Sequence, residues 1–126
     1  MKDGQFDPQK HVNYCHLVGE VQQISHVEGT GVSPHSIIIL KVQTEYRGAK
    51  HPPMTIQVVA WDHFMQLLKD AEVGKGTLLN IEGRLTVRFK KNRMYFGVTA
   101  NRIGVVREVG GEVFIETLQE EKDGSQ

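Results

Sequence analysis

Apolar and polar residues alternate along several segments of the chain, and this period of two is typical of β-strands with one buried face. The segments that show it are residues 11–27, 35–44, 54–61, 77–89 and 94 to about 106. Val, Ile and Thr are frequent in them, and these residues favour strands. The pattern therefore predicts five strands.

One short helix is predicted between the third and fourth strands. Asp62 is a good N-cap residue, and Gly74 is well placed to end the helix. The apolar positions at helical spacing are Phe64, Leu67, Leu68 and Ala71. Five strands with a helix in this position are the element order of the OB-fold, a five-stranded Greek-key barrel that binds oligonucleotides or oligosaccharides. We expect an all-β chain with this barrel over residues 11–107.

The fourth strand contains a glycine, Gly83, in the middle of its apolar pattern. A glycine inside a strand indicates a bulge or a sharp coil, which a small barrel needs in order to close. The residues of the fourth and fifth strands expected to point inward are Leu79, Ile81, Leu85, Val87, Met94, Phe96, Val98 and Ala100.

The flanking segments have a different character. Residues 1–10 are polar and are expected to form a flexible arm. Gly110 and Gly111 should break the sheet, and residues 113–115 are expected to add a short strand or clasp. The whole segment 108–126 is predicted to be a short acidic tail, disordered from Glu116 onward.

Charge is unevenly distributed along the chain. The 15 Lys and Arg residues balance the 15 Asp and Glu residues, so bulk attraction to a polyanion is not expected. Residues 83–107, however, contain seven Lys or Arg residues and no acidic one. On the fourth strand Arg84, Arg88 and Lys90 share the face opposite Leu85 and Val87. A polyanionic partner would therefore be met by a local patch.

Catalytic and metal-binding patterns are missing from the sequence. Cys15 and His16 are adjacent on a strand, so their side chains project to opposite faces and cannot act as nucleophile and base together. The other histidines lack the paired spacing of metal ligands. We expect no catalytic residue, no metal and no cofactor. A single cysteine and no apolar membrane segment predict a cytoplasmic protein.

Unpaired nucleic acid is held by a cationic groove and by aromatic rings on which bases stack. Trp61 lies on the face of the third strand opposite the core, and it either stacks a base or caps the barrel against the helix. Phe89 has the parity of the core, but it lies at the tip of a hairpin where both faces can be wet. The candidate stacking residues are Tyr46, Trp61, Phe89 and Tyr95. The candidate phosphate-binding residues are Arg47, Lys50, Arg84, Arg88, Lys90, Lys91 and Arg93.

Three segments of the chain, residues 14–21, 56–61 and 76–85, resemble the bacterial single-stranded DNA-binding proteins. The most specific is the run Ile-Glu-Gly-Arg-Leu at residues 81–85. The resemblance implies a homodimer or homotetramer that binds unpaired DNA without sequence preference, in replication, repair or recombination. It places Tyr46, Trp61 and Phe89 where that family has stacking aromatics, and it places Thr55 where a further aromatic is expected.

The end of the sequence departs from that family, which usually closes in an acidic tip with a proline and an aromatic. Residues 120–126 have no apolar terminus. The likeness therefore extends to shorter relatives, such as a primosomal or replication-restart adaptor barrel or a phage or plasmid form. A structural adaptor that binds proteins is the alternative from another class.

The expected partners are single-stranded DNA and further copies of the chain, and replication or repair proteins are left open as a third class. RNA is left open as the ligand, and no membrane partner is expected. We expect the oligomer interface to involve the first strand, at Val12, Tyr14 and His16.

Overall fold

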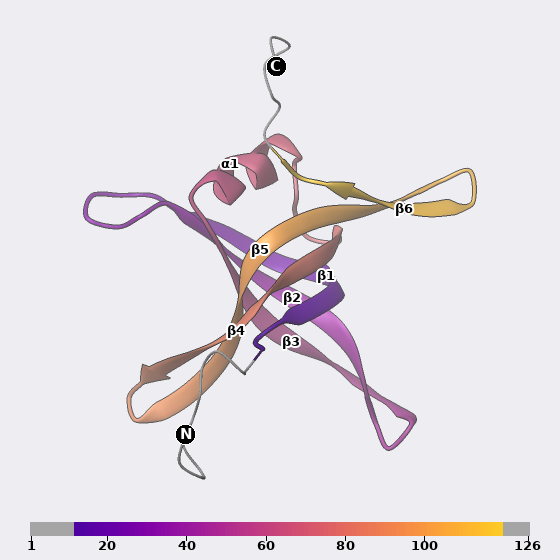
Figure 1. Ribbon diagram of the computed structural model, residues 1–126, viewed down its shortest axis with the longest axis horizontal. Coiled ribbons are helices and arrows are strands. Elements are labelled where there is room, and N and C mark those ends of the chain that lie inside the picture. Colours follow the sequence, from indigo (N-terminus) through magenta and orange to yellow (C-terminus); the bar gives the residue numbers. More distant parts are fainter. Residues whose placement is uncertain (1–11, 120–126) are drawn as a thin grey trace.

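The computed structural model describes residues 12–119, which form six strands and one helix (Figure 1). In chain order the elements are β1 (Cys15–Val27), β2 (His35–Tyr46), β3 (Ala49–Trp61), α1 (His63–Asp70), β4 (Leu78–Lys90), β5 (Arg93–Val109) and β6 (Glu112–Thr117). The arm predicted at residues 1–10 and the last part of the predicted tail, residues 120–126, lie outside the described residues.

Five of the strands close into a barrel. Antiparallel ladders join β1 to β2, β2 to β3, β1 to β4 and β4 to β5. A short parallel pairing of residues 57–59 of β3 with residues 97–99 of β5 completes the circle. A closed barrel of five strands with one helix between β3 and β4 is an OB-fold, so the predicted fold class is confirmed.

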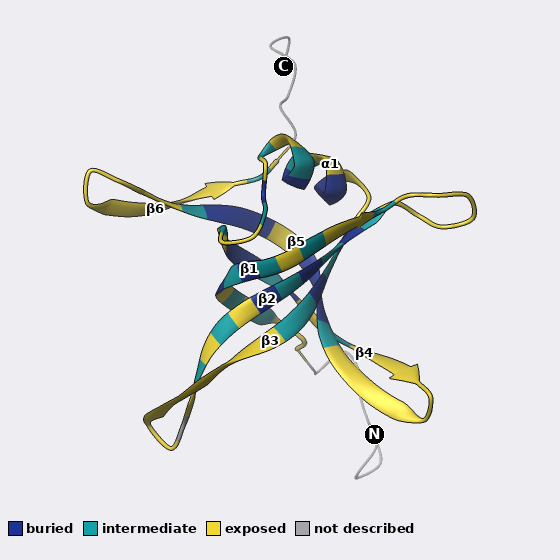
Figure 2. Ribbon diagram, turned by 180° about the vertical axis from the view of Figure 1, so that it is seen from behind, coloured by how far each residue is buried: buried dark blue, intermediate teal, exposed yellow. Residues whose placement is uncertain are grey.

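Buried residues occur on all five barrel strands (Figure 2), and their aliphatic side chains fill the interior. The larger ones with no exposed surface are Val21, Ile38, Leu40, Val58, Leu79, Ile81 and Ile103. Helix α1 adds Phe64 and Leu68 to the same cluster. Each such side chain contributes about 1.5–3 kcal/mol when it is fully removed from water.

Gly83 is the irregularity that the sequence predicts in β4. The register between β4 and β5 shifts between Glu82 and Gly83. A Cβ atom at Gly83 would clash with the carbonyl oxygen of Thr99 on the neighbouring strand. Only glycine lets the two backbones approach this closely. The pairing of β1 with β4 also ends at Gly83, opposite Cys15.

Beyond Gly83, β4 and β5 leave the barrel as a projecting hairpin. Alternation correctly predicts which residues share a face, but outside the barrel no second layer formed by the described residues 12–119 covers that face. Leu85, Val87, Met94 and Phe96 were expected to point into the core and are instead 42–58% exposed. Val98 and Ala100, which lie within the barrel, are buried as predicted.

β2 and β3 extend from the barrel in the same way. They pair as far as Tyr46 and Ala49, and the turn between them is formed by Arg47 and Gly48, both with positive φ. The segment 45–53, between the second and third predicted strands, is therefore mostly hairpin. Met54 has the parity of Ile56 on β3 but is 60% exposed.

Helix α1 begins where it was predicted to begin but ends earlier. Asp62 is the N-cap residue of α1, but its side chain makes no capping hydrogen bond. The helix ends at Asp70, before Gly74, because Glu72 adopts a left-handed φ of 55°.

Strand β1 begins at Cys15 and not at His11, which lies outside the described residues. The side chain of Asn13 continues the ladder to β4 in place of a strand backbone. The amide nitrogen of Leu85 donates to Asn13 Oδ1 (2.8 Å), and Asn13 Nδ2 donates to the carbonyl oxygen of Leu85 (2.9 Å).

A third hairpin joins β5 to β6. Gly110 and Gly111 form its turn with φ values of 61° and 85°, and they connect the two strands where a break in the sheet was expected. The predicted short strand over 113–115 is present, and β6 extends to Thr117, into the segment expected to be disordered. The amide nitrogen of Leu118 donates to the carbonyl oxygen of Ile103 (2.8 Å).

We expect Gly83→Ala to lower the free energy of unfolding by about 1–3 kcal/mol, because the added methyl group forces β4 away from β5. Urea denaturation measures the difference. Gly74→Ala is the matched control, since no atom lies within 4 Å of a Cβ atom at that position. Equal unfolding midpoints for the two variants would contradict the close approach at Gly83.

Burial, with a smaller contribution from the positive charge of Lys69, lowers the pKa of His26 below its usual 6.5. Its Nδ1 lies 2.7 Å from the hydroxyl of buried Ser36. The folded state thus favours the neutral imidazole, so this contribution to stability is complete above pH 6.5 and declines as the pH falls below it. Chemical denaturation above and below pH 6.5 measures how far the free energy of unfolding falls as the pH is lowered. This fall should be smaller for His26→Asn than for the wild type. An equal fall in the two proteins would show that His26 does not contribute to this pH dependence.

Candidate nucleic-acid interface

A shallow cleft lies on the outer wall of the barrel, between β3 and the base of the β4–β5 hairpin. Its volume is about 170 Å³. The cleft forms because β3 and β5 pair over three residues only, after which the hairpin diverges from β3. The lining residues are Gln57, Val59, Trp61, Thr86, Arg88, Phe96, Gly97 and Thr99.

Trp61 ends β3 and is 44% exposed. Its cross-strand neighbour is His35, and the two ring centroids lie 4.6 Å apart with the planes tilted by 42°. The Nδ1 atom of His35 donates to the carbonyl oxygen of Ser33 (2.8 Å), which holds that ring in place. Among the described residues, the core cluster that contains Phe64 does not include Trp61. Trp61 is therefore supported by His35 and open to solvent, and it does not cap the barrel against α1.

Two arginines extend along the same wall. Arg88 Nη2 donates to Gln57 Oε1 (3.3 Å), and Arg84 Nη1 donates to Asn101 Oδ1 (3.3 Å). Both acceptors are neutral amides, so the positive charges stay uncompensated by these contacts. Tyr95 pairs with Arg88 across the ladder and is 42% exposed. The wall thus combines an aromatic ring with guanidinium groups that can bind phosphate.

The tip of the β4–β5 hairpin holds four further candidates. Phe89 is 77% exposed and pairs with Met94. It alternates with Arg88, so it lies on the opposite face from the wall of Trp61. Lys90, Lys91 and Arg93 are exposed at the tip.

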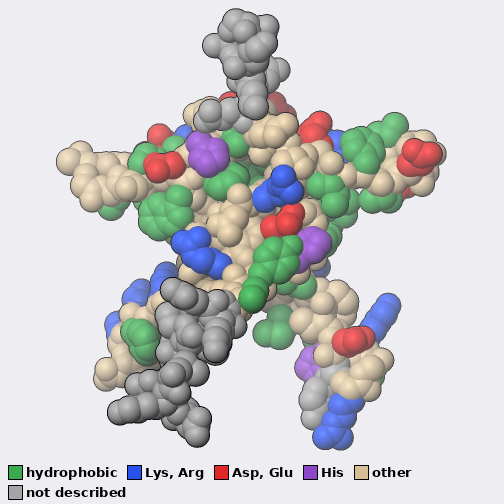
Figure 3. Space-filling model, viewed as in Figure 1, with side chains coloured by type: hydrophobic (Ala, Val, Ile, Leu, Met, Phe, Trp, Pro, Cys, Tyr) green, Lys and Arg blue, Asp and Glu red, His purple; other side chains and the backbone are tan. Residues whose placement is uncertain are grey.

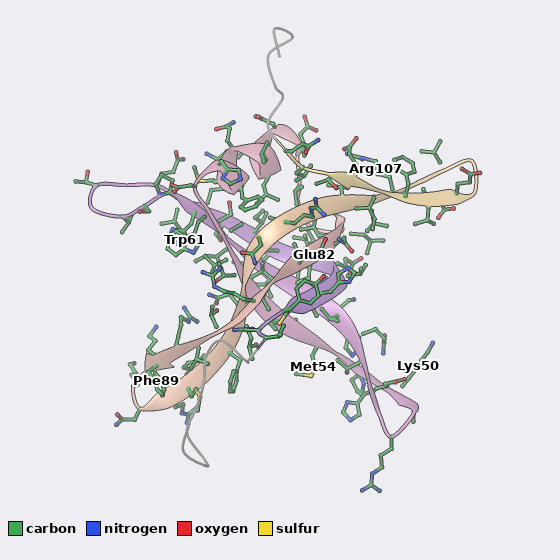
Figure 4. The ribbon with its side chains drawn as sticks, viewed as in Figure 1. Lys50, Met54, Trp61, Glu82, Phe89 and Arg107 are labelled. Atoms are coloured by element: carbon green, nitrogen blue, oxygen red, sulfur yellow. The ribbon has the colours of Figure 1, made fainter. Side chains whose placement is uncertain are left out.

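The remaining candidates lie on the β2–β3 hairpin. Arg47 and Lys50 are exposed near its tip, whereas the side chain of Tyr46 lies outside the described part of the structure. Figure 4 shows Lys50 and Phe89 on two different hairpins, with Trp61 on the barrel above Phe89. The structure therefore brings Trp61, Arg84, Arg88 and Tyr95 together and divides the other candidates between two hairpin tips.

Sequence reasoning missed two residues of this surface. Phe96 was expected to face inward, yet it borders the cleft. His35 supports Trp61 through a register that no local pattern reveals. Gln57, in contrast, shares the face of Trp61 by strand alternation, a signal that the sequence contains and that could have identified it as a lining residue.

The candidate oligomer residues lie at and before the start of β1. Val12 is 90% exposed and Tyr14 is 59% exposed. The Tyr14 hydroxyl donates to Glu82 Oε1 (2.9 Å), and this hydrogen bond raises the pKa of Tyr14. The Nε2 atom of His16 lies 2.6 Å from Asn80 Oδ1. Both side chains are thus held against β4.

Two larger clefts, of about 420 and 820 Å³, lie between α1 and residues 116–119. Asp70 and Glu116 line the larger one, and among the described residues Arg102 is the one Lys or Arg that lines either. These clefts therefore lack the charge that a polyanion requires. In the described part of the chain, no group of three or more His, Cys, Asp or Glu residues could hold a metal ion. No helix there is long and apolar enough to cross a membrane.

No model of a known protein family matches the chain, and no curated protein matches it. Solved structures do match. A small single-stranded DNA-binding protein from Streptomyces coelicolor has a TM-score of 0.58 at 20% identity, over 73% of this chain and 90% of that one. A deletion mutant of the single-stranded DNA binding protein from Thermus aquaticus has a TM-score of 0.63 at 22% identity, over 82% of this chain and 54% of that one.

The dimeric N-terminal domain of the PriB protein from Thermoanaerobacter tencongensis has a TM-score of 0.54 at 23% identity. The match covers 76% of this chain and 98% of that domain. This chain shares their fold.

We expect His35→Ala to expose Trp61 further, because the ring that supports it is removed. The emission of this single tryptophan should shift to longer wavelength and be quenched more strongly by iodide. His63→Ala is the matched control, since His63 contacts the ring of Phe64 and not that of Trp61. Identical spectra for the two variants would refute the contact between His35 and Trp61.

Proposed function

We propose that this chain is a non-enzymatic protein that binds single-stranded DNA without sequence preference, in replication, repair or recombination. One observation carries the proposal: the open ring of Trp61 and the guanidinium of Arg88 line the same cleft. Their juxtaposition allows a base to stack and a phosphate to bind within one short segment of the DNA.

The outer wall would form the central part of the binding path. A base would stack on Trp61, which is worth about 1–3 kcal/mol per stacked base. Arg84 and Arg88 would contact the adjacent phosphates, since their amide partners leave the charge free. The similarity in fold to two single-stranded DNA-binding proteins supports this assignment.

The hairpin tips would extend the path in two directions. Lys90, Lys91 and Arg93 would bind phosphates at one tip, and Arg47 and Lys50 at the other, with Tyr46 as a further stacking residue. Tyr95 would stack beside Arg88. Phe89 faces away from Trp61, so a DNA strand that reaches both rings has to pass around the edge or the tip of the β4–β5 hairpin.

Self-association through β1 is part of the same proposal. Val12, Tyr14 and His16 lie on an exposed surface that also includes Val18 (47% exposed) and Leu78 (44% exposed). A homodimer or homotetramer would place several clefts along the same single strand of DNA. The dimeric PriB domain of similar fold supports this arrangement.

A protein adaptor is the second candidate, and it is favoured by the apolar face of the β4–β5 hairpin. Leu85, Val87 and Met94 lie on this face and are 42–53% exposed, and a group of exposed apolar side chains is typical of an interaction site. An adaptor would bind a protein through this face. A nucleic acid could bind at the same time to the opposite face, which carries Arg84 and Arg88.

Titration with oligothymidylate tests the proposal. We expect the emission of Trp61 to be quenched, because a base stacks on its ring. Binding should weaken with salt, and Arg88→Gln should reduce the slope of log affinity against log salt by about 0.7, the contribution of one phosphate on a single strand. With labelled oligothymidylate, Trp61→Ala should weaken binding by about 1–3 kcal/mol.

Lys75→Gln is the matched control, since Lys75 is exposed in the loop before β4 and does not line the cleft. It should keep the wild-type slope. A complex that is insensitive to salt, or that survives Arg88→Glu unchanged, would overturn the phosphate contacts and favour the adaptor. Tighter binding of duplex or RNA would overturn the choice of ligand.

A further inference from the structure

Two of the projecting hairpins have opposite charge. The basic hairpin, residues 84–96 of β4 and β5, contains five Lys or Arg residues and no acidic one. The acidic hairpin, residues 107–117 of β5 and β6, contains Glu108, Glu112 and Glu116 against Arg107. Figure 3 shows Lys and Arg side chains on the first hairpin at lower left, and acidic side chains at the tip of the second at upper right.

Few of these charges are compensated within the chain. Arg107 Nη2 lies 3.1 Å from Glu116 Oε1. Among the described residues, Glu108 and Glu112 form no ion pair, and neither do the five cations of the basic hairpin. Both hairpins therefore present free charge to an external partner.

Both hairpins also expose apolar side chains. On the basic hairpin these are Leu85, Val87, Phe89, Met94 and Phe96. On the acidic hairpin they are Val109, Val113, Phe114 and Ile115, which are 45–66% exposed. Within the described chain β6 pairs with β5 alone, so its outer edge has backbone groups free to pair. Opposite charge around exposed apolar groups is the composition of a protein interface.

The two hairpins also match in length. Within these ranges the acidic hairpin has three cross-strand pairs, from Arg107 with Phe114 to Val109 with Glu112, and the basic one has four, from Val87 with Phe96 to Lys90 with Arg93. At about 3.3 Å per residue, the paired part of each extends about 10–13 Å. The β2–β3 hairpin matches less well, because it carries Glu45 beside Arg47 and Lys50.

The hairpins project from opposite sides of the barrel (Figure 1). They cannot meet within one chain, so the complementary partner of each is supplied by another copy. We propose that the acidic hairpin of one copy docks on the basic hairpin of a second copy. The two surfaces differ, so the contact is head-to-tail and generates a ring or an open chain of copies.

Charge reversal tests the contact. We expect the weight-average mass of the wild type, measured by sedimentation at low salt, to rise with protein concentration, and to rise less in 1 M salt, where the Debye length is about 3 Å. Glu112→Lys and Arg93→Glu should each weaken association about tenfold or more, because like charges then face each other. An equimolar mixture of the two variants should associate again, because each reversed hairpin meets its complement.

Glu45→Lys is the matched control: it makes the same charge change on the β2–β3 hairpin and should keep the wild-type mass. Glu108→Lys replaces Glu112→Lys if circular dichroism shows that the latter is unfolded. A wild type whose mass does not depend on concentration, an unchanged mass in the single variants, or a mixture that associates no better than its components would overturn the contact. Glu112 lies outside the cleft, so the oligothymidylate titration reports separately on the proposed function.

Discussion

The close approach of β4 to β5 at Gly83 is the constraint on which the rest of the structure depends. A side chain at this position would clash with the carbonyl oxygen of Thr99. With glycine there, β4 pairs with both β1 and β5 inside the barrel and then continues with β5 alone. The barrel and the projecting hairpin are thus two parts of the same pair of strands.

That geometry also creates the cleft. The parallel contact of β3 with β5 closes the barrel but ends after three residues, so the hairpin separates from β3 and leaves a space beside Trp61. Trp61 is supported on one side by His35, and Arg88 is positioned by Gln57. A rigid sheet therefore presents a ring and a cation in fixed relation, which limits the entropy lost when a ligand binds.

A chain without net charge can still present a strong local field when its charges are separated in space. Here the basic β4–β5 hairpin and the acidic β5–β6 hairpin project from different sides of the barrel. At physiological ionic strength charges about 8 Å or more apart are largely screened, so each hairpin acts on its own surroundings. The same cations are proposed to meet phosphates and the glutamates of another copy, so the two partners would compete for them.

The sequence by itself determined the order of the elements, the inward residues within the barrel, the irregularity at Gly83 and the location of the basic segment. These follow from alternation, helical spacing and glycine chemistry, which act between near neighbours in the chain. The sequence also predicted, from strand alternation, that four candidate side chains point away from the core. They are Trp61, Arg84, Arg88 and Tyr95.

Only the tertiary structure decided whether a face is covered. Leu85, Val87 and Phe96 have the alternation of core residues, but they lie where the strands extend past the barrel and no layer in the described part of the chain opposes them. It also decided that Phe89 is exposed at a projecting tip and that His35 supports Trp61. These positions depend on pairings between segments that are distant in the chain, and local patterns contain no information about such pairings.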